Sequence, residues 1–194
     1  RYAGYQLESY NQMYKDAVKL MGGTDLEAFD LTKEKEEVKE RYGSSKVGLG
    51  ALLARRLVEA DVRFVQVDYS GWDMHNDVAG GMATKGPALD QAVSALIRDL
   101  DSSGLLDETL IVLASEFGRS PAINQNAGRD HHPAAFSYVL AGAGIKGGAV
   151  YGKSDEKGHG IDEDPVGITD FNSTVTVAYG LDPNKEHFAP NGRP

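Results

Sequence analysis

Two short segments of the chain carry side chains of the kinds that bind metal ions. Asp73 and His75 are separated by one residue, and Asp130 is followed directly by His131 and His132. In an extended segment the side chains of residues i and i+2 point to the same side, so Asp73 and His75 could reach one cation together. Imidazole nitrogens and carboxylate oxygens are common ligands of divalent metals. The two segments therefore predict a metal site.

Each segment also has a simpler interpretation. An Asp-x-His pair often arises by chance, and of two adjacent histidines one can bind a metal while the other hydrogen-bonds to the fold. For His131 and His132 we favour a ligand role for at least one of the two. His159 and His187 lie in polar surroundings, where we expect exposed histidines without a ligand role.

A third segment adds another carboxylate and a guanidinium. Glu116 ends an apolar run and is followed closely by Arg119. Glu116 could bind the metal or act as a base, and Arg119 or Arg129 could bind the anionic oxygens of a substrate. The alternative is an ion pair between Glu116 and Arg119 that closes the turn, and it is equally compatible with the sequence.

The elements that must position these segments follow from the pattern of apolar residues. A helical period predicts helices at 2–20, from about Thr32 to Gly43, from Ser44 or Ser45 to about Ala60, and at 89–100. Apolar runs predict strands at 62–68, 109–115 and 136–141. Residues 170–179 are predicted as a short helix with Asp170 as N-cap and Gly180 after its end, Gly80-Gly81 as a flexible connection, and 155–164 as an exposed loop or hairpin tip.

Helices that alternate with apolar strands predict an α/β fold with a mostly parallel sheet and helices on both faces. Residues 1–43 are charged and have little β character, so we expect a peripheral helical segment there and the α/β domain at 44–194. In open sheets of this kind, ligands bind at the ends of the strands. The three polar segments would meet at that edge.

The composition limits the possible partners. The formal charge is −9 and no basic cluster is longer than Arg55-Arg56, so nucleic acid and an anionic membrane surface are not expected as partners. The chain has no cysteine, which excludes disulfides and thiolate metal sites. No apolar run approaches the ~18 residues of a membrane span.

Because the chain begins at Arg1 rather than Met, we expect a segment upstream. The sequence does not indicate an oligomeric state.

Three sequence blocks together resemble a known family. They are Gly71-Trp72-Asp73-Met74-His75, Ala114-Ser115-Glu116-Phe117-Gly118-Arg119 and Gly128-Arg129-Asp130-His131-His132-Pro133. In this order they are similar to DUF1501, a large bacterial family of domains of unknown function that is grouped with the alkaline phosphatases and sulfatases. The glycine-rich residues 141–148 and 150–152 also match. The resemblance covers roughly residues 44–182 and would make the chain the C-terminal part of such a protein.

The resemblance implies a three-layer α/β/α fold of the alkaline phosphatase type and metal-assisted hydrolysis of phosphate or sulfate esters. By position, Asp73 and His75 resemble the Asp and His ligands of that superfamily. Glu116 stands where a further ligand Asp would be, and His131 or His132 where the last ligand His would be. The resemblance also implies an exported, for example periplasmic, location.

Two positions depart from the superfamily pattern. Phe117 stands where a second adjacent ligand, a histidine, would be. The Asp of the first strand and the nucleophile have no counterpart, because residues 1–43 are predicted to be helical. Both departures bear on whether the site is active.

The expected function is therefore a metal-dependent hydrolase of small anionic esters. One divalent cation, zinc by its preference for imidazole and carboxylate, would be bound by Asp73, His75 and one of the two adjacent histidines. Glu116 would be a further ligand or the base, and Arg119 or Arg129 would bind the substrate. Two alternatives stay open: a catalytically degenerate binding or scaffold domain, and Asp–His pairs that only fix loops.

Overall fold

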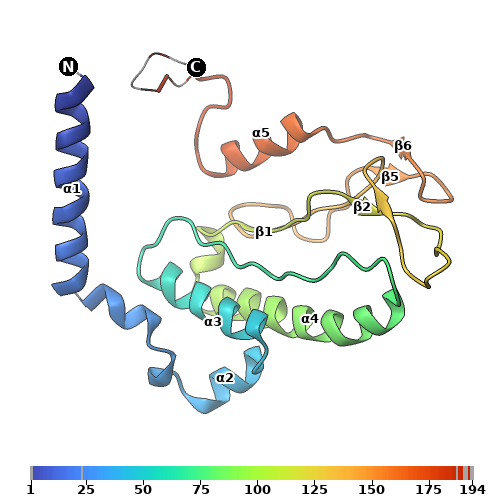
Figure 1. Cartoon of the computed structure of the whole chain (residues 1–194), viewed down its shortest axis with the longest axis horizontal. Coiled ribbons are helices and arrows are strands. Elements are labelled where there is room, and N and C mark those ends of the chain that lie inside the picture. The colour runs from blue at the N-terminus through green and yellow to red at the C-terminus, as the bar shows by residue number, and fades with distance from the viewer. Residues whose placement is uncertain (1, 23, 187, 190–191, 193–194) are drawn as a thin grey trace. The chain divides into compact units, whose positions relative to one another are not determined.

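The computed structural model describes residues 2–22, 24–186, 188–189 and 192. The chain divides into two compact units. The first contains Arg1–Ser70 and Gly86–Asp99, and the second contains Gly71–Lys85 and Leu100–Pro194. Figure 1 shows the helices and strands along the chain. Among the described residues, no helix combines the length and the apolar character that crossing a bilayer requires.

The first unit is helical. Its elements are α1 (Tyr2–Gly22), the short 3-10 helices η1 (Thr24–Phe29) and η2 (Leu31–Lys33), α2 (Glu36–Tyr42), α3 (Lys46–Glu59) and the middle of α4 (Val78–Ser102). The predicted helix from Thr32 is in fact η2 followed by α2, and it ends as predicted at Gly43, whose φ of 76° favours glycine. The predicted helix at 44–60 is confirmed: the Ser45 side chain caps α3 by accepting the Gly48 N–H at 3.1 Å.

Three helices bury the core of this unit. Tyr42 of α2, Leu52 of α3 and Ala92 of α4 have no exposed surface. The other buried members of the cluster are Val47, Ala51 and Ala95. Because alanine is small, α3 and α4 can pack closely at these positions. The Tyr42 hydroxyl donates to Asp99 at 3.1 Å, so burial of the ring leaves no polar atom without a partner.

We expect Leu52→Ala to lower the free energy of unfolding by about 3 kcal/mol, because a fully buried leucine is removed and a cavity is left behind. Leu49→Ala, on the same helix but with a side chain that is 39% exposed, is the matched control and should cost less than about 1 kcal/mol. Urea unfolding followed by circular dichroism measures both. Equal losses would contradict this assignment of the core.

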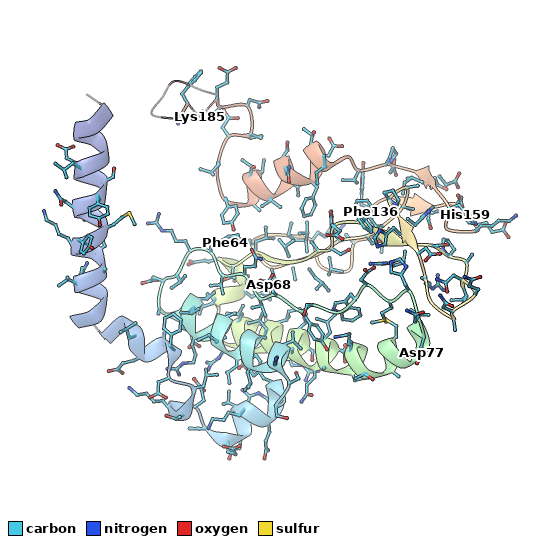
Figure 2. The ribbon with its side chains drawn as sticks, viewed as in Figure 1. Phe64, Asp68, Asp77, Phe136, His159 and Lys185 are labelled. Atoms are coloured by element: carbon cyan, nitrogen blue, oxygen red, sulfur yellow. The ribbon has the colours of Figure 1, made fainter. Side chains whose placement is uncertain are left out.

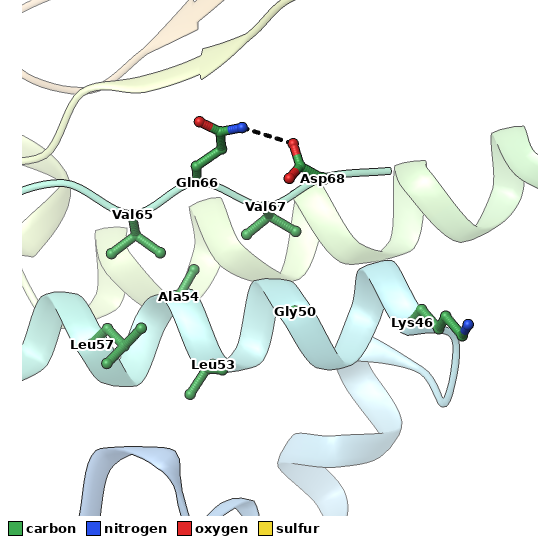
Figure 3. Close-up of a pocket in the computed structure, with 9 residues that line it drawn as sticks. All are labelled: Lys46, Gly50, Leu53, Ala54, Leu57, Val65, Gln66, Val67 and Asp68. Atoms are coloured by element: carbon green, nitrogen blue, oxygen red, sulfur yellow. Dashed lines mark hydrogen bonds between the residues drawn. The ribbon is translucent and has the colours of Figure 1, made fainter. Parts of the chain in front are cut away.

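The predicted strand at 62–68 is wrong as a paired strand. The segment is extended, but no described residue pairs with it as a ladder. Figure 3 shows Val65 and Val67 directed towards α3 and Gln66 directed away, where it donates to Asp68 at 2.8 Å. The two valines line a groove of about 260 Å³ against α3. The alternating pattern therefore reflects one face packed on a helix, without a neighbouring strand.

The second unit holds the strands and the last helix. β1 (Ile111–Leu113) pairs with β4 (Val139–Ala141), β2 (Gly118–Arg119) with β3 (His131–His132), and β5 (Lys153–Ser154) with β6 (Ile161–Glu163), while η3 (Leu105–Asp107) precedes β1 and α5 (Ile168–Ala178) follows β6. All three pairs are antiparallel. The predicted strands at 109–115 and 136–141 are thus present in shorter form.

The predicted mostly parallel, three-layer α/β/α sheet of the alkaline phosphatase type is wrong. Every strand pair among the described residues is antiparallel and two-stranded. The physical reason lies in the connection between β1 and β4: residues 114–138 contain the β2–β3 hairpin and no helix. A parallel neighbour requires a long crossover, usually a helix, whereas an antiparallel neighbour can be reached by returning loops.

The predicted flexible connection at Gly80-Gly81 is wrong, because both glycines lie inside α4. The Asp77 side chain accepts the Gly80 N–H at 3.1 Å. The predicted helix near 170–179 is confirmed as α5, but Asp170 accepts the Gly167 N–H at 2.9 Å from inside the first turn, and Gly167 is the N-cap. The hairpin tip predicted at 155–164 is confirmed by the β5–β6 pair. The boundary proposed between residues 43 and 44 stays a prediction.

Candidate metal centre

Two loops of the second unit are joined through their backbones. The Arg129 N–H donates to the Met74 carbonyl at 2.9 Å, and the Asp77 N–H donates to the Asn126 carbonyl at 3.0 Å. An isolated bridge between Asn76 and Ala127 lies between these bonds. The loop that carries Asp73 and His75 is therefore held against the loop that leads to Asp130.

Gly128 is required for this close approach. A Cβ atom at Gly128 would lie 2.0 Å from the carbonyl carbon of His75 and 2.1 Å from its oxygen. These are backbone atoms, so no side chain can move aside to make room. Any residue other than glycine at this position would push the two loops apart.

Strand pairing orients the two adjacent histidines. In the β2–β3 pair, Arg119 lies opposite His131 and Gly118 lies opposite His132. Successive side chains of a strand point to opposite faces, so His131 and His132 diverge. His131 shares its face with Arg119, and this is the face on which Asp73 lies: its Oδ1 is 2.9 Å from His131 Nε2 and 2.6 Å from Arg119 Nη1.

Asp73, His75 and His131 form a compact triangle of potential ligand atoms. Asp73 Oδ1 is 3.0 Å from His75 Nε2 and 2.9 Å from His131 Nε2, and the two Nε2 atoms are 3.2 Å apart. Neighbouring ligand atoms of a tetrahedral site with bonds of about 2.0–2.1 Å lie roughly 3.3 Å apart. In an octahedral site with bonds of the same length the separation is roughly 2.9 Å. The residues present fit a divalent metal.

The hydrogen bonds of this cluster leave one nitrogen of His75 free to bind a ligand. His75 Nδ1 lies 2.8 Å from Asp130 Oδ1, and this contact is a hydrogen bond only if Nδ1 donates, because an ionised carboxylate only accepts. In neutral His75 the Nε2 atom then carries a lone pair that faces the triangle. The three atoms can be bridged by a proton, as in the hydrogen bond of His131 Nε2 with Asp73 Oδ1 at 2.9 Å, or by a metal ion. A metal ion would satisfy all three at once.

Asp130 and Asn124 support His75 from behind. Asn124 Nδ2 donates to Asp130 Oδ1 at 3.0 Å and to the His75 carbonyl at 3.1 Å. Asn124 Oδ1 accepts the N–H groups of Asn126 and Gly128, both at 2.9 Å. Hydrogen bonds from His75 and then Asn124 lower the pKa of Asp130, which therefore stays ionised at neutral pH. A carboxylate behind the imidazole is the arrangement that commonly orients metal-binding histidines.

Asp73 is kept as an anion by its neighbours. A hydrogen bond with His131 and then the contact with Arg119 lower the pKa of Asp73 to about 2. Its side chain is 62% exposed, so a ligand from solvent can reach it. Arg119 Nη1 is buried and pairs with Asp73 Oδ1 at 2.6 Å. The Arg119 side chain as a whole is 25% exposed, so part of it can be reached from solvent.

The comparison with known proteins concerns nearly the whole chain. The family described as "Protein of unknown function (DUF1501)" matches residues 3–194. The chain belongs to this family. The resemblance drawn from three sequence blocks is thus confirmed at the level of DUF1501, and the match also includes the N-terminal helices. A search of curated proteins and a search of solved structures found no match.

Three other candidate residues of this DUF1501 chain lie elsewhere. His132 Nε2 is 2.9 Å from the carbonyl oxygen of His159, to which it must donate, and His159, labelled in Figure 2, lies in the turn between β5 and β6. Glu116 is exposed and is not among the three residues whose ligand atoms converge. Arg129 Nη1 donates to the Ser120 carbonyl at 2.7 Å, so Arg129 supports a loop. The ion pair of Arg119 is with Asp73 rather than with Glu116.

Sequence reasoning missed the supporting role of Asn124, and it grouped Asp130 with the metal-capable residues rather than with the support of His75. The available signal was the run from Asn124 to Gly128, because asparagine commonly binds the backbone two residues further along in tight turns. His187 lies outside the described residues.

Proposed function

We propose that this DUF1501 protein is a metal-dependent hydrolase of small anionic esters, of the phosphate or sulfate class. The observation that carries the proposal is the convergence of Asp73 Oδ1, His75 Nε2 and His131 Nε2 within hydrogen-bonding distance of one another. These are the ligand types that zinc prefers. The proposal includes a functional relationship to alkaline phosphatases and sulfatases, supported by the sequence blocks that contain these residues.

Asp73, His75 and His131 would hold the ion. A bound divalent metal supplies a Lewis acid for the ester oxygen and lowers the pKa of bound water toward ~7. Asp130 keeps the His75 ring oriented and its Nδ1 protonated, which leaves Nε2 for the metal. Metal binding and the orientation of His75 thus involve only Asp73, His75, His131 and Asp130, which the structure brings together.

Arg119 would bind the substrate. The protein carries a formal charge of −9, so an anionic ester is repelled overall and needs a local positive charge. The Arg119 guanidinium supplies such a charge beside the triangle: its Nη1 pairs with Asp73 Oδ1 at 2.6 Å, and its side chain is 25% exposed. A planar guanidinium can bind two oxygens of a phosphate or sulfate group at once. Of the two arginines predicted to bind the substrate, Arg119 is thus the principal candidate, because Arg129 donates to the Ser120 carbonyl.

A second candidate function is a binding or scaffold domain without catalysis. The Phe117 ring lies 4.6 Å from the His131 ring and the Arg119 guanidinium carbon lies 5.8 Å from the Phe117 centroid. An apolar ring thus occupies the position beside His131 where a further ligand would favour a second metal. A centre with one metal can bind ligands without turning them over.

An assay of the full chain with zinc on aryl phosphate and aryl sulfate esters tests the proposal. We expect turnover that is lost with a chelator and restored by zinc, and a kcat/KM lowered by at least ~10³-fold in His75→Ala. His132→Ala, which alters a histidine outside the triangle, should stay within a few-fold of the unaltered chain. A folded, zinc-loaded chain that turns over neither ester would favour the binding domain instead.

An exported location is part of the same proposal. It is supported by the resemblance of the three sequence blocks, whereas the absence of cysteine is compatible with either side of a membrane. Fractionation of cells that express the complete gene product would test it.

A further inference from the structure

One face of α1 is apolar and uncovered. The large side chains that form this face are more than half exposed, from 56% for Tyr10 to 68% for Met13. The members of this face, called here the α1 stripe, are Leu7, Tyr10, Met13, Tyr14, Ala17 and Val18. Exposed apolar patches of this extent commonly mark a binding surface.

The spacing of the stripe is that of a helix that pairs with another helix. Leu7, Tyr10, Tyr14 and Ala17 follow one another at intervals of three, four and three residues, which is the a/d repeat of a coiled coil. Met13 and Val18 widen the stripe on its two sides. The charged residues of the helix lie outside the repeat: Glu8, Lys15, Asp16 and Lys19.

α1 also needs a partner for its own stability. An isolated helix of about 20 residues is marginal in water, and helices in proteins are stabilised mainly by packing of their apolar face. Among the described elements, α1 packs mainly against the adjoining η1. The α1 stripe is the apolar face that such packing would use.

We propose that the α1 stripe pairs with the α1 stripe of a second copy of this chain, in an antiparallel arrangement. Antiparallel helices place an a position of one helix beside a d position of the other. In the proposed register, Leu7 of one helix lies opposite Ala17 of the other, and Tyr10 lies opposite Tyr14, so the numbers of two facing residues always sum to 24. A large residue then meets a small one at both ends, and the aromatic rings meet in the centre, where they can pack as tilted pairs.

The area of the α1 stripe is sufficient for a dimer. With aromatic side chains contributing about 150–250 Å² each, the exposed part of the stripe is on the order of 600 Å² per chain. Pairing two copies would bury roughly 1,200 Å² in total, the lower end of standard interfaces. The interface therefore predicts a reversible dimer rather than a permanent one.

The charge of α1 favours a second helix over a membrane surface. Glu8 and Asp16 balance Lys15 and Lys19, so the helix has no net charge (2 − 2 = 0) although the chain carries −9. Helices that lie on anionic membranes carry an excess of lysine and arginine on their polar face. A neutral helix adds no repulsion of its own between two copies and gains nothing from anionic lipid.

Sedimentation of the full chain tests the dimer. We expect a concentration-dependent dimer whose dissociation constant rises at least ~10-fold in Tyr10→Glu. Ser9→Glu adds the same charge at the neighbouring position outside the a/d repeat and should leave the dimer unchanged. Far-UV circular dichroism checks that both variants fold. A monomeric unaltered chain, or a Tyr10→Glu chain that dimerises like Ser9→Glu, would overturn the proposal.

A single introduced cysteine tests the direction of pairing, because the chain has no other cysteine. In this register residue 13 is within two positions of its own copy (13 + 13 = 26) and on the same side of the helix pair, so Met13→Cys should form a disulfide-linked dimer on oxidation. Residue 10 meets its own copy only in a parallel dimer, so Tyr10→Cys should link poorly. Preferential linking through Tyr10→Cys, or co-sedimentation of monomers with anionic lipid vesicles, would contradict the antiparallel dimer.

Discussion

Replacing His131 by alanine is expected to raise the dissociation constant for zinc by at least ~100-fold, whereas replacing the neighbouring His132 should change it less than about threefold. The reason is strand geometry. His131 Nε2 lies 2.9 Å from Asp73 Oδ1 and 3.2 Å from His75 Nε2, while His132 Nε2 donates to the His159 carbonyl on the other face.

The two variants are closely matched. Each removes one imidazole from adjacent positions of the same strand, so their effects on charge and local sequence are alike. An ordinary aspartate has a pKa of about 3.9, so Asp73 is ionised at neutral pH in both variants, with or without the hydrogen bond with His131 that lowers its pKa. Any difference in zinc affinity then reports which ring faces the triangle.

Competition with a chromophoric chelator measures the affinities, and metal analysis after gel filtration measures the stoichiometry. We expect one zinc per chain for the unaltered protein and for His132→Ala. If His132→Ala loses zinc as completely as His131→Ala, the triangle is not the metal site. If the unaltered chain retains no zinc, the hydrolase proposal fails with it.

Gly128→Ala is expected to lower the free energy of unfolding of the second unit by roughly 2–4 kcal/mol and to weaken zinc binding by at least ~10-fold. The added Cβ would lie 2.0 Å from a backbone carbon of His75, which cannot move without moving the ring of His75. The backbone bonds that join the two loops would then lengthen, and His75 would shift away from Asp73 and His131.

Gly147→Ala is the control for this prediction, because a Cβ at Gly147 meets no atom within 4 Å. It should change neither stability nor zinc affinity. Thermal unfolding in the presence and absence of zinc provides both values, since a ligand that binds the folded state raises the transition temperature. A Gly128→Ala chain that keeps full stability and full affinity would show that the two loops are not in contact at this position.

The local elements were predictable because their signals are local. The Ser45 cap, the stop at Gly43 and the helix before Gly180 each depend on side chain and backbone atoms within a few residues. The resemblance to DUF1501 was readable for the same reason, since it depends on short blocks of sequence.

The sheet was not predictable in the same way. The apolar run at 62–68 has the propensity of a strand, but propensity does not supply a neighbour, and the run packs on α3 instead. The runs at 111–113 and 139–141 do pair, in the antiparallel direction, because the chain between them returns without a crossover helix. Pairing depends on distant residues and on the path between them, which periodicity does not describe.

For the candidate site too, the sequence indicated which residue types are available, and the tertiary structure decided which of them meet. The sequence by itself determined that Asp73, His75 and an Asp-His-His run are available for metal chemistry, and that disulfide and thiolate chemistry are excluded. Only the tertiary structure decided that His131 faces the triangle, that His132 and Glu116 do not, and that Asp130 and Asn124 hold His75 in place. The physical reason is that a metal site requires atoms about 3 Å apart, and such separations are set by the packing of loops that lie more than fifty residues apart in the chain.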